Sequence, residues 1–189
     1  MTKEIDLRDA WLSKAYAVTK YLPELYNEQG IYTSNEWTSF SDIGNEVNRH
    51  GEILTLQEYL QVETAYIEAV KIFMRSLGKE SIVLFDVLKH SAKKLFKPHH
   101  IDLYTLYKQI ENKGCYSIEE VDSIVKLALR ELAQLSILID KDTNSCVHFG
   151  FDYYMYFVSD GIDVTEMAEE IEGLGIFMMV RRKIFSIKS

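Results

Sequence analysis

The sequence predicts an α+β protein in which a helix-rich N-terminal two-thirds packs on a C-terminal antiparallel β-meander. Two observations favour this class. Up to about residue 132 the apolar residues recur mainly at the three- and four-residue spacing of helices, behind recognisable helix-start signals. From residue 136 onwards short apolar runs alternate with Asp, Asn and Gly, as in strands joined by tight turns. Strands adjacent in sequence usually pair as antiparallel neighbours, which gives the meander.

The first helix is expected over about residues 7–22. It should end before Pro23, because proline disfavours helical geometry in the residue that precedes it. The polar stretch 27–51 is then expected to form loops and short turns that Trp37 and Phe40 anchor to the core.

Two further helices are indicated by capping boxes, in which a hydroxyl and a carboxylate three residues apart satisfy free backbone amides. Thr55 and Glu58 open a helix that runs to about residue 78, and Ser117 and Glu120 open another. A shorter helix is expected over residues 102–112. Apolar residues follow both capping boxes at helical spacing, so each helix should turn one stripe toward a core.

The predicted strands are short apolar runs bounded by turn residues. Residues 81–88 fit either a buried strand or a helical turn, and a strand is favoured because β-branched and aromatic residues are frequent there. The other expected strands are residues 136–140, 146–149, 151–158 and 173–180. A short acidic helix, capped by Asp163 or Thr165, is expected to end at Glu172.

Length and composition predict one globular domain over residues 1–189, since a chain of this size can bury a sizeable core unaided. Cys115 and Cys146 are far apart with no CxxC motif, and no apolar signal region follows Met1, so a reduced, cytoplasmic setting is expected. No apolar run is long enough for a membrane span. The acidic pI of about 5.2 disfavours nucleic-acid binding.

Common enzyme signatures are missing from the sequence, which has no glycine-rich phosphate loop, HExxH motif or Gly-x-Ser-x-Gly elbow. Two weaker alternatives remain. His99, His100 and Asp102 are possible metal ligands, although a surface turn explains them better. Cys146 and His148 could form a thiol and base pair, although a structural cysteine in a hairpin is the simpler interpretation. No catalytic residue, metal or cofactor is therefore assigned.

The strongest feature is an acid-rich segment over residues 140–172. It holds nine carboxylates against one base, Lys141, and carries a formal charge of −8, equal to that of the whole chain. Residues 1–139 contribute −4 and residues 173–189 contribute +4. Isolated surface acids need no function, but a strong field of one sign accelerates encounter with a basic partner.

An aromatic run over residues 149–157 lies inside the acidic segment. Tyrosines of this kind dominate the energetics of many protein interfaces. If the run is a continuous strand, Phe149, Phe151 and Tyr153 alternate into the core. The intervening side chains then face the other way: Asp152, Tyr154 and Tyr156.

Several blocks of the sequence resemble immunity proteins of bacterial contact-dependent growth inhibition and related polymorphic toxin systems. The blocks are residues 147–157, the acidic helix after them, residues 173–178, residues 41–44 and residues 54–60. The resemblance implies a cytosolic inhibitor, made beside its toxin, that binds the C-terminal domain of the toxin and blocks its active site. Many such toxins are nucleases, whose positive clefts an acidic inhibitor can match.

The resulting hypothesis is a stoichiometric inhibitor, without catalysis of its own, of a basic toxin such as a tRNase. The expected toxin-binding residues are Asp140, Asp142, Asp152, Tyr153, Tyr154, Tyr156, Asp160, Asp163, Glu166, Glu169 and Glu170. The acids would supply steering and ion pairs, and the tyrosines would supply desolvated anchors. The alternatives are a small metal-dependent enzyme with a cleft near His99, or a regulatory or scaffold subunit that docks through its helices.

Overall fold

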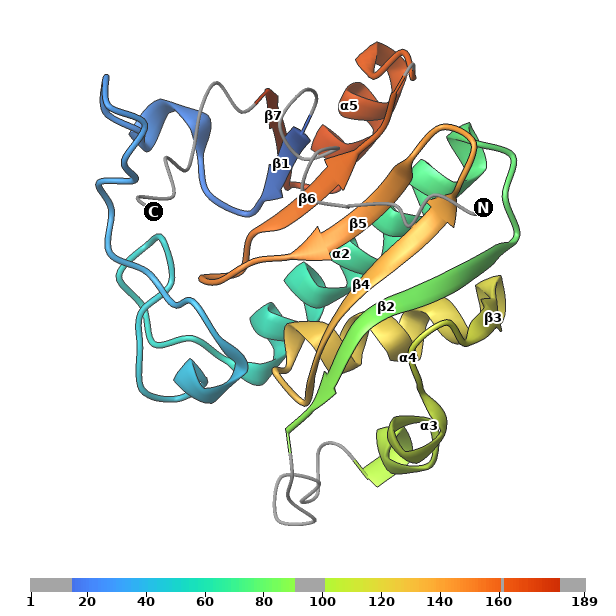
Figure 1. Cartoon of the computed structure of the whole chain (residues 1–189). Helices are drawn as coiled ribbons and strands as arrows, with labels where there is room; N and C mark the ends of the chain where they lie inside the picture. The colour runs from blue at the N-terminus through green and yellow to red at the C-terminus, as the bar shows by residue number, and fades with distance from the viewer. Residues whose placement is uncertain (1–14, 91–100, 161, 181–189) are drawn as a thin grey trace, which may run out of the picture.

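A computed structural model describes residues 15–90, 101–160 and 162–180 of the chain. Its centre is a seven-stranded antiparallel sheet, with α2 and α4 crossing behind it in Figure 1. The strands are β1 (Ala15–Thr19), β2 (Ser81–Lys89), β3 (Cys115–Ser117), β4 (Ala133–Asp140), β5 (Ser145–Phe149), β6 (Met155–Val158) and β7 (Phe177–Val180). The α-helices are α2 (Leu56–Ser76), α3 (Tyr104–Gln109), α4 (Ile118–Leu129) and α5 (Thr165–Glu172). The spatial order of the strands is β3-β2-β4-β5-β6-β1-β7.

The predicted fold class is wrong, because the N-terminal two-thirds is not a helical layer that rests on a C-terminal sheet. It supplies β1, β2 and β3 to the same sheet as the later strands, so the molecule is a mixed α/β protein. The expected helix over residues 7–22 is wrong where it can be compared, since residues 15–19 form β1. Residues 7–14 lie outside the described part of the chain.

The position of β1 explains this error. It lies between β6 and β7 and pairs with both, with Ala15 opposite Val158 and Thr19 opposite Phe177. Hydrogen bonds to two neighbouring strands stabilise the extended conformation of these residues, although their apolar spacing favours a helix. Intrinsic helix propensity is only a weak preference, which tertiary contacts override. The neighbours come from sequence more than 130 residues away, beyond the reach of a local pattern.

The predicted hairpin is confirmed, because β4 and β5 pair with Ser136 opposite His148. Strands β4, β5 and β6 form the consecutive part of the meander. The last predicted strand exists as β7, but β1 separates it from β6. The strand expected over residues 151–158 begins only at Met155, because residues 151–154 form a turn.

Both predicted capping boxes are confirmed. The Thr55 hydroxyl accepts a hydrogen bond from the Glu58 amide at 3.2 Å, and the Glu58 carboxylate accepts one from the Thr55 amide at 2.9 Å. Ser117 and Glu120 make the equivalent box at the start of α4. Residues 81–88 lie in strand β2, which confirms the strand favoured over a helical turn.

The main core lies between the helices and the sheet. The rings of Phe73 on α2 and Phe157 on β6 stack with centroids 4.5 Å apart, and Met167 and Ile171 of α5 are buried in the same cluster. Helix α2 contacts both α4 and α5, so one long helix organises this layer. In the described part of the chain, no helix combines the length and apolar character that crossing a bilayer requires.

Candidate interaction site

The structure divides the predicted site between the two ends of β5. The β4–β5 turn, the end of β6 and α5 lie at one end, which we call the acidic end. Its carboxylates are Asp140, Asp142, Asp160, Asp163, Glu166, Glu169 and Glu170. The β5–β6 turn, with Asp152, Tyr153 and Tyr154, lies at the opposite end, which we call the tyrosine end. The predicted residues therefore do not form one contiguous surface around this hairpin.

Helix α5 sets the direction of three of these acids. Met167 and Ile171, four residues apart, are buried against the helical layer. Helical geometry then turns Glu166, Glu169 and Glu170 toward solvent, and all three are exposed. Their exposure is thus a consequence of the apolar pair that docks the helix.

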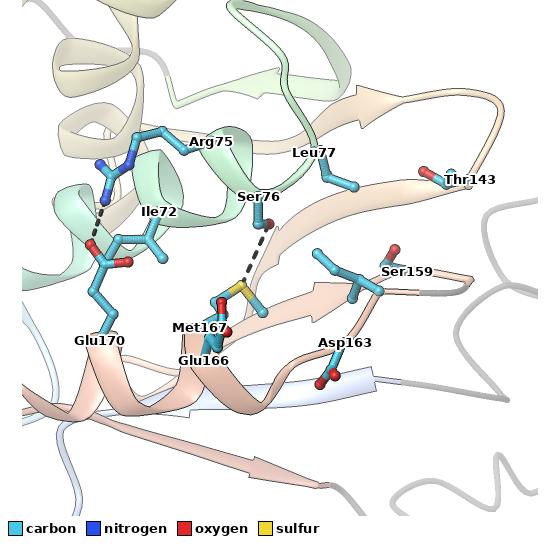
Figure 2. A pocket seen from close by; sticks show the side chains of 11 residues that line it. Ile72, Arg75, Ser76, Leu77, Thr143, Ser159, Asp163, Glu166, Met167 and Glu170 are labelled. Carbon is cyan, nitrogen blue, oxygen red and sulfur yellow. Dashed lines mark hydrogen bonds and ion pairs between the residues drawn. The ribbon is translucent and has the colours of Figure 1, made fainter.

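A hollow of about 580 Å³ lies between the end of α2 and α5 (Figure 2). Its apolar lining includes Ile72, Leu77, Ile162 and Met167. Its acidic lining consists of Asp163, Glu166 and Glu170. Arg75 pairs with Glu170 across the hollow, and Ser76 donates a weak hydrogen bond to the Met167 sulfur at 3.9 Å. The α2 residues of this lining were missed from sequence, because they come from a helix about 90 residues upstream of α5.

Asp140 differs from its neighbours because it holds the β4–β5 turn together. Its carboxylate pairs with Lys79 at 2.9 Å and accepts a hydrogen bond from Thr143 at 2.8 Å. The chain of hydroxyls continues from Thr143 to Ser145 at 2.6 Å and from Ser145 to Ser159 at 2.7 Å. The hydrogen bond from Lys79 is the main cause that lowers the pKa of Asp140. Asp140 is therefore a fixed negative charge with a structural role.

Five other carboxylates of the acidic end have no ion pair with any described residue: Asp142, Asp160, Asp163, Glu166 and Glu169. Asp160 accepts a hydrogen bond from the Asn144 amide group at 3.0 Å, which ties the β6–α5 connection to the β4–β5 turn. The backbone amide of Thr165 donates to Asp163 at 3.0 Å and lowers its pKa. All five are exposed, so the acidic end presents negative charge to solvent.

At the tyrosine end, the structure places two predicted anchors below the surface. Tyr153 is 5% exposed, and its ring lies 4.8 Å from Trp37, 5.7 Å from Tyr59 and 5.1 Å from Tyr66 between centroids. Tyr156 is 7% exposed. Neither side chain is available at the surface to anchor a partner. Tyr154 is half-buried, with its hydroxyl 2.7 Å from that of Tyr26.

The aromatic run is not one continuous strand, and this changes which ring is exposed. Asp152 and Tyr153 have φ values of 54° and 61°, and the Tyr154 amide donates to the Phe151 carbonyl at 3.1 Å, which closes a tight turn. The expected alternation therefore fails, and Phe151 is 92% exposed while Tyr153 is buried. Gly150 and Asp152 belong to residue types that favour turns, so they are the sequence signal that could have predicted this turn.

The geometry gives little support to the two chemical alternatives, which are a thiol nucleophile with its base and a metal site. Cys146 is buried in a small cluster that is separate from the main core. Burial raises the pKa of its thiol to about 12, which suppresses the thiolate that nucleophilic attack needs. His148 Nδ1 forms a hydrogen bond with the Ser136 hydroxyl at 3.0 Å. Within residues 15–90, 101–160 and 162–180, no group of three His, Cys, Asp or Glu side chains is placed to hold a metal. His99 and His100 fall outside those ranges.

The comparisons with known proteins add neither a family nor a relative. No protein-family model, curated protein or solved structure matches the chain. The resemblance to immunity proteins therefore stays a hypothesis that depends on the quoted sequence blocks.

Proposed function

We propose that the protein is a cytosolic immunity protein that binds a basic toxin domain, such as a nuclease, and blocks its activity without catalysis of its own. The observation that supports this proposal is the acidic end, where five exposed carboxylates have no ion pair with a described residue. A nuclease needs a positive cleft for phosphates, so a surface of this charge is complementary to it.

Tyr153 and Tyr156 are left out of the proposed contact surface because they are buried. Asp140 contributes charge but is committed to the β4–β5 turn. The contact is therefore centred on Asp142, Asp160, Asp163 and the exposed glutamates of α5. In this arrangement the carboxylates act mainly on the rate of association and on its salt dependence.

The first test is co-expression of the chain with the protein encoded immediately upstream of it, followed by titration of that protein's nuclease activity. We expect loss of activity at one-to-one stoichiometry. If the two proteins form no complex and the activity persists, the proposal is wrong.

The second test reverses charge at the acidic end. The double variant Glu166→Lys and Glu169→Lys should lower the association rate at least roughly tenfold at low salt, with a smaller effect at high salt. The matched control is Glu24→Lys with Glu28→Lys, which changes the net charge equally at exposed positions outside the acidic end. Equal losses in the two variants would show that total charge, rather than this surface, controls association.

A further inference from the structure

The hollow between α2 and α5 combines buried apolar side chains with a charged, exposed rim. Ile72 and Met167 are 4% and 3% exposed, and the half-buried Leu77 and Ile162 complete the apolar lining. The volume of about 580 Å³ lies within the range of roughly 300 to 1,000 Å³ that is typical of small-molecule sites. The apolar lining can therefore shield an inserted group from water on several sides.

One wall of the hollow is held in place by hydrogen bonds within the fold. Ser159 and Thr143 line this wall, and Ser159 is only 2% exposed. The hydroxyls of both residues lie within hydrogen-bonding distance of the Ser145 hydroxyl, at 2.7 Å and 2.6 Å. Thr143 also donates to Asp140. The wall is thus pre-formed, which reduces the ordering cost of binding.

The rim carries more carboxylates than its own cation neutralises. Arg75 pairs with Glu170, and Figure 2 shows this pair on one side of Met167 and Asp163 on the other. Asp163 and Glu166 are exposed, and neither forms an ion pair with a described residue. The lining therefore has a formal charge of −2, since it holds three acids and one arginine.

These features select the chemistry of the occupant. A neutral apolar group would displace water from Asp163 and Glu166 without replacing its hydrogen bonds, which is costly. An anion would be repelled by the same acids. A long aliphatic chain that ends in a cation satisfies both parts of the hollow, because such side chains pack their stems on apolar surface and keep their charge at the polar edge. Arg75 already places a guanidinium against a carboxylate at this rim.

We infer that the hollow is a binding site for one long cationic side chain of a partner protein, an arginine or a lysine. Its stem contacts Ile72 and Met167, and its head group pairs with Asp163 and Glu166. As a description of the toxin contact, this inference rests on the proposed function. It deepens that function, because it names the kind of side chain that the partner inserts and the place that receives it.

The experiment is a titration of the full chain, isotope-labelled at its methionine methyl groups, with small mimics of these side chains. n-Butylguanidinium should shift the Met167 methyl signal in a saturable manner, with a Kd on the order of a few millimolar, as for a ligand of its size. n-Butylurea lacks the charge and guanidinium lacks the stem, so each should bind at least roughly fivefold more weakly. Tighter binding of n-butylguanidinium than of n-butylammonium identifies arginine as the occupant, the reverse order identifies lysine, and either order supports the inference.

Charge removal at the rim tests the head-group contact. Asp163→Asn with Glu166→Gln should weaken the binding of n-butylguanidinium at least roughly fivefold, because it removes both unpaired charges while keeping the side-chain size. Asparagine also keeps an acceptor for the Thr165 amide. The matched control is Asp142→Asn with Glu169→Gln, which removes the same charge from exposed positions that do not line the hollow. It should leave the Kd nearly unchanged.

The outcomes separate this inference from the proposed function, because the mimics need no toxin. The absence of a saturable shift at Met167 would overturn the inference, and so would equal binding of n-butylurea or an equal loss in the control variant. The proposed function would then still be decided by the co-expression test. If n-butylguanidinium binds as expected and the upstream protein forms no complex, the proposed function is wrong and the site stands, with its cationic side chain supplied by a different protein.

Discussion

At the scale of single residues, the pair formed by Glu63 and Arg130 is the most sensitive point of the fold. The guanidinium makes two hydrogen bonds of 2.6 Å to the carboxylate, whose side chain is 1% exposed against 7% for the arginine. Arg130→Met should lower the free energy of unfolding by about 3 to 5 kcal/mol, because it leaves a buried carboxylate without its partner. Chemical denaturation of the variant measures this loss.

A control substitution separates the effect of the buried pair from that of an exposed one. Arg75→Met is the matched control, because its pair with Glu170 is more than half exposed and contributes less than about 1 kcal/mol. Equal losses in the two variants would contradict the assignment of the Glu63–Arg130 pair.

The residue scale is also where sequence reasoning about the site failed. Glu63 lies at the helical spacing of the apolar stripe of α2 and is buried, but its partner Arg130 lies 67 residues further along the chain, beyond the reach of a local pattern. The expected alternation places both Phe151 and Tyr153 in the core, but only Tyr153 is buried, because two left-handed residues turn the chain at this point. The glutamates of α5 are exposed because helical spacing places them away from the buried Met167 and Ile171, and this spacing is a local property of the sequence.

At the scale of elements, the capping boxes give a direct test. Thr55→Ala removes the hydroxyl that accepts from the Glu58 amide, and it should lower the free energy of unfolding by about 1 kcal/mol. Thr64→Ala is the matched control, because it makes the same substitution on an exposed face of the same helix. It should be neutral or stabilise by about 0.5 kcal/mol, since alanine has the higher helix propensity. A larger loss for Thr64→Ala than for Thr55→Ala would contradict the capping role.

Elements were predictable where their signals are local. The starts of α2 and α4 and the β4–β5 turn follow from neighbouring residues, and each is confirmed. Strand β1 was not predictable, because its conformation is set by β6 and β7 from the far end of the sequence. The insertion of β1 between them also separates β7 from the meander, so one unpredicted strand accounts for much of the error in topology.

At the scale of the whole molecule, buried ionisable side chains set the response to alkali, and they act in two opposite directions. Burial lowers the pKa of Lys20 to about 8, although its ion pair with Glu36 partly offsets this. As pH rises, the folded chain therefore loses the Lys20 proton at a lower pH than the unfolded chain, in which the lysine pKa is 10.5. The unfolded state binds more protons in that window, so the contribution of Lys20 to stability rises between about pH 8 and 10.5.

The buried tyrosines have the opposite effect above pH 10. Burial raises the pKa of Tyr21, Tyr59, Tyr66 and Tyr153 above their unfolded value near 10. Their contribution is fully present below that value, and it decreases as pH rises further because only the unfolded chain ionises. The buried Cys146 thiol, whose pKa burial raises from 9.0 to about 12, acts in the same direction and offsets the gain from Lys20 above pH 9. We expect stability to rise between about pH 8 and 9, to change little up to about pH 10 and then to fall steeply, which denaturation curves at a series of pH values would measure.

The ultraviolet absorbance of tyrosinate distinguishes this mechanism from general charge repulsion. The signal of the buried tyrosines should appear together with the loss of circular dichroism, because those hydroxyls cannot ionise in the folded chain. Tyr21→Phe should make the alkaline transition shallower, since one fewer proton is released on unfolding. If the full tyrosinate signal develops near pH 10 while the chain remains folded, the cluster of rings around Tyr153 is open to solvent, and burial does not control the alkaline transition.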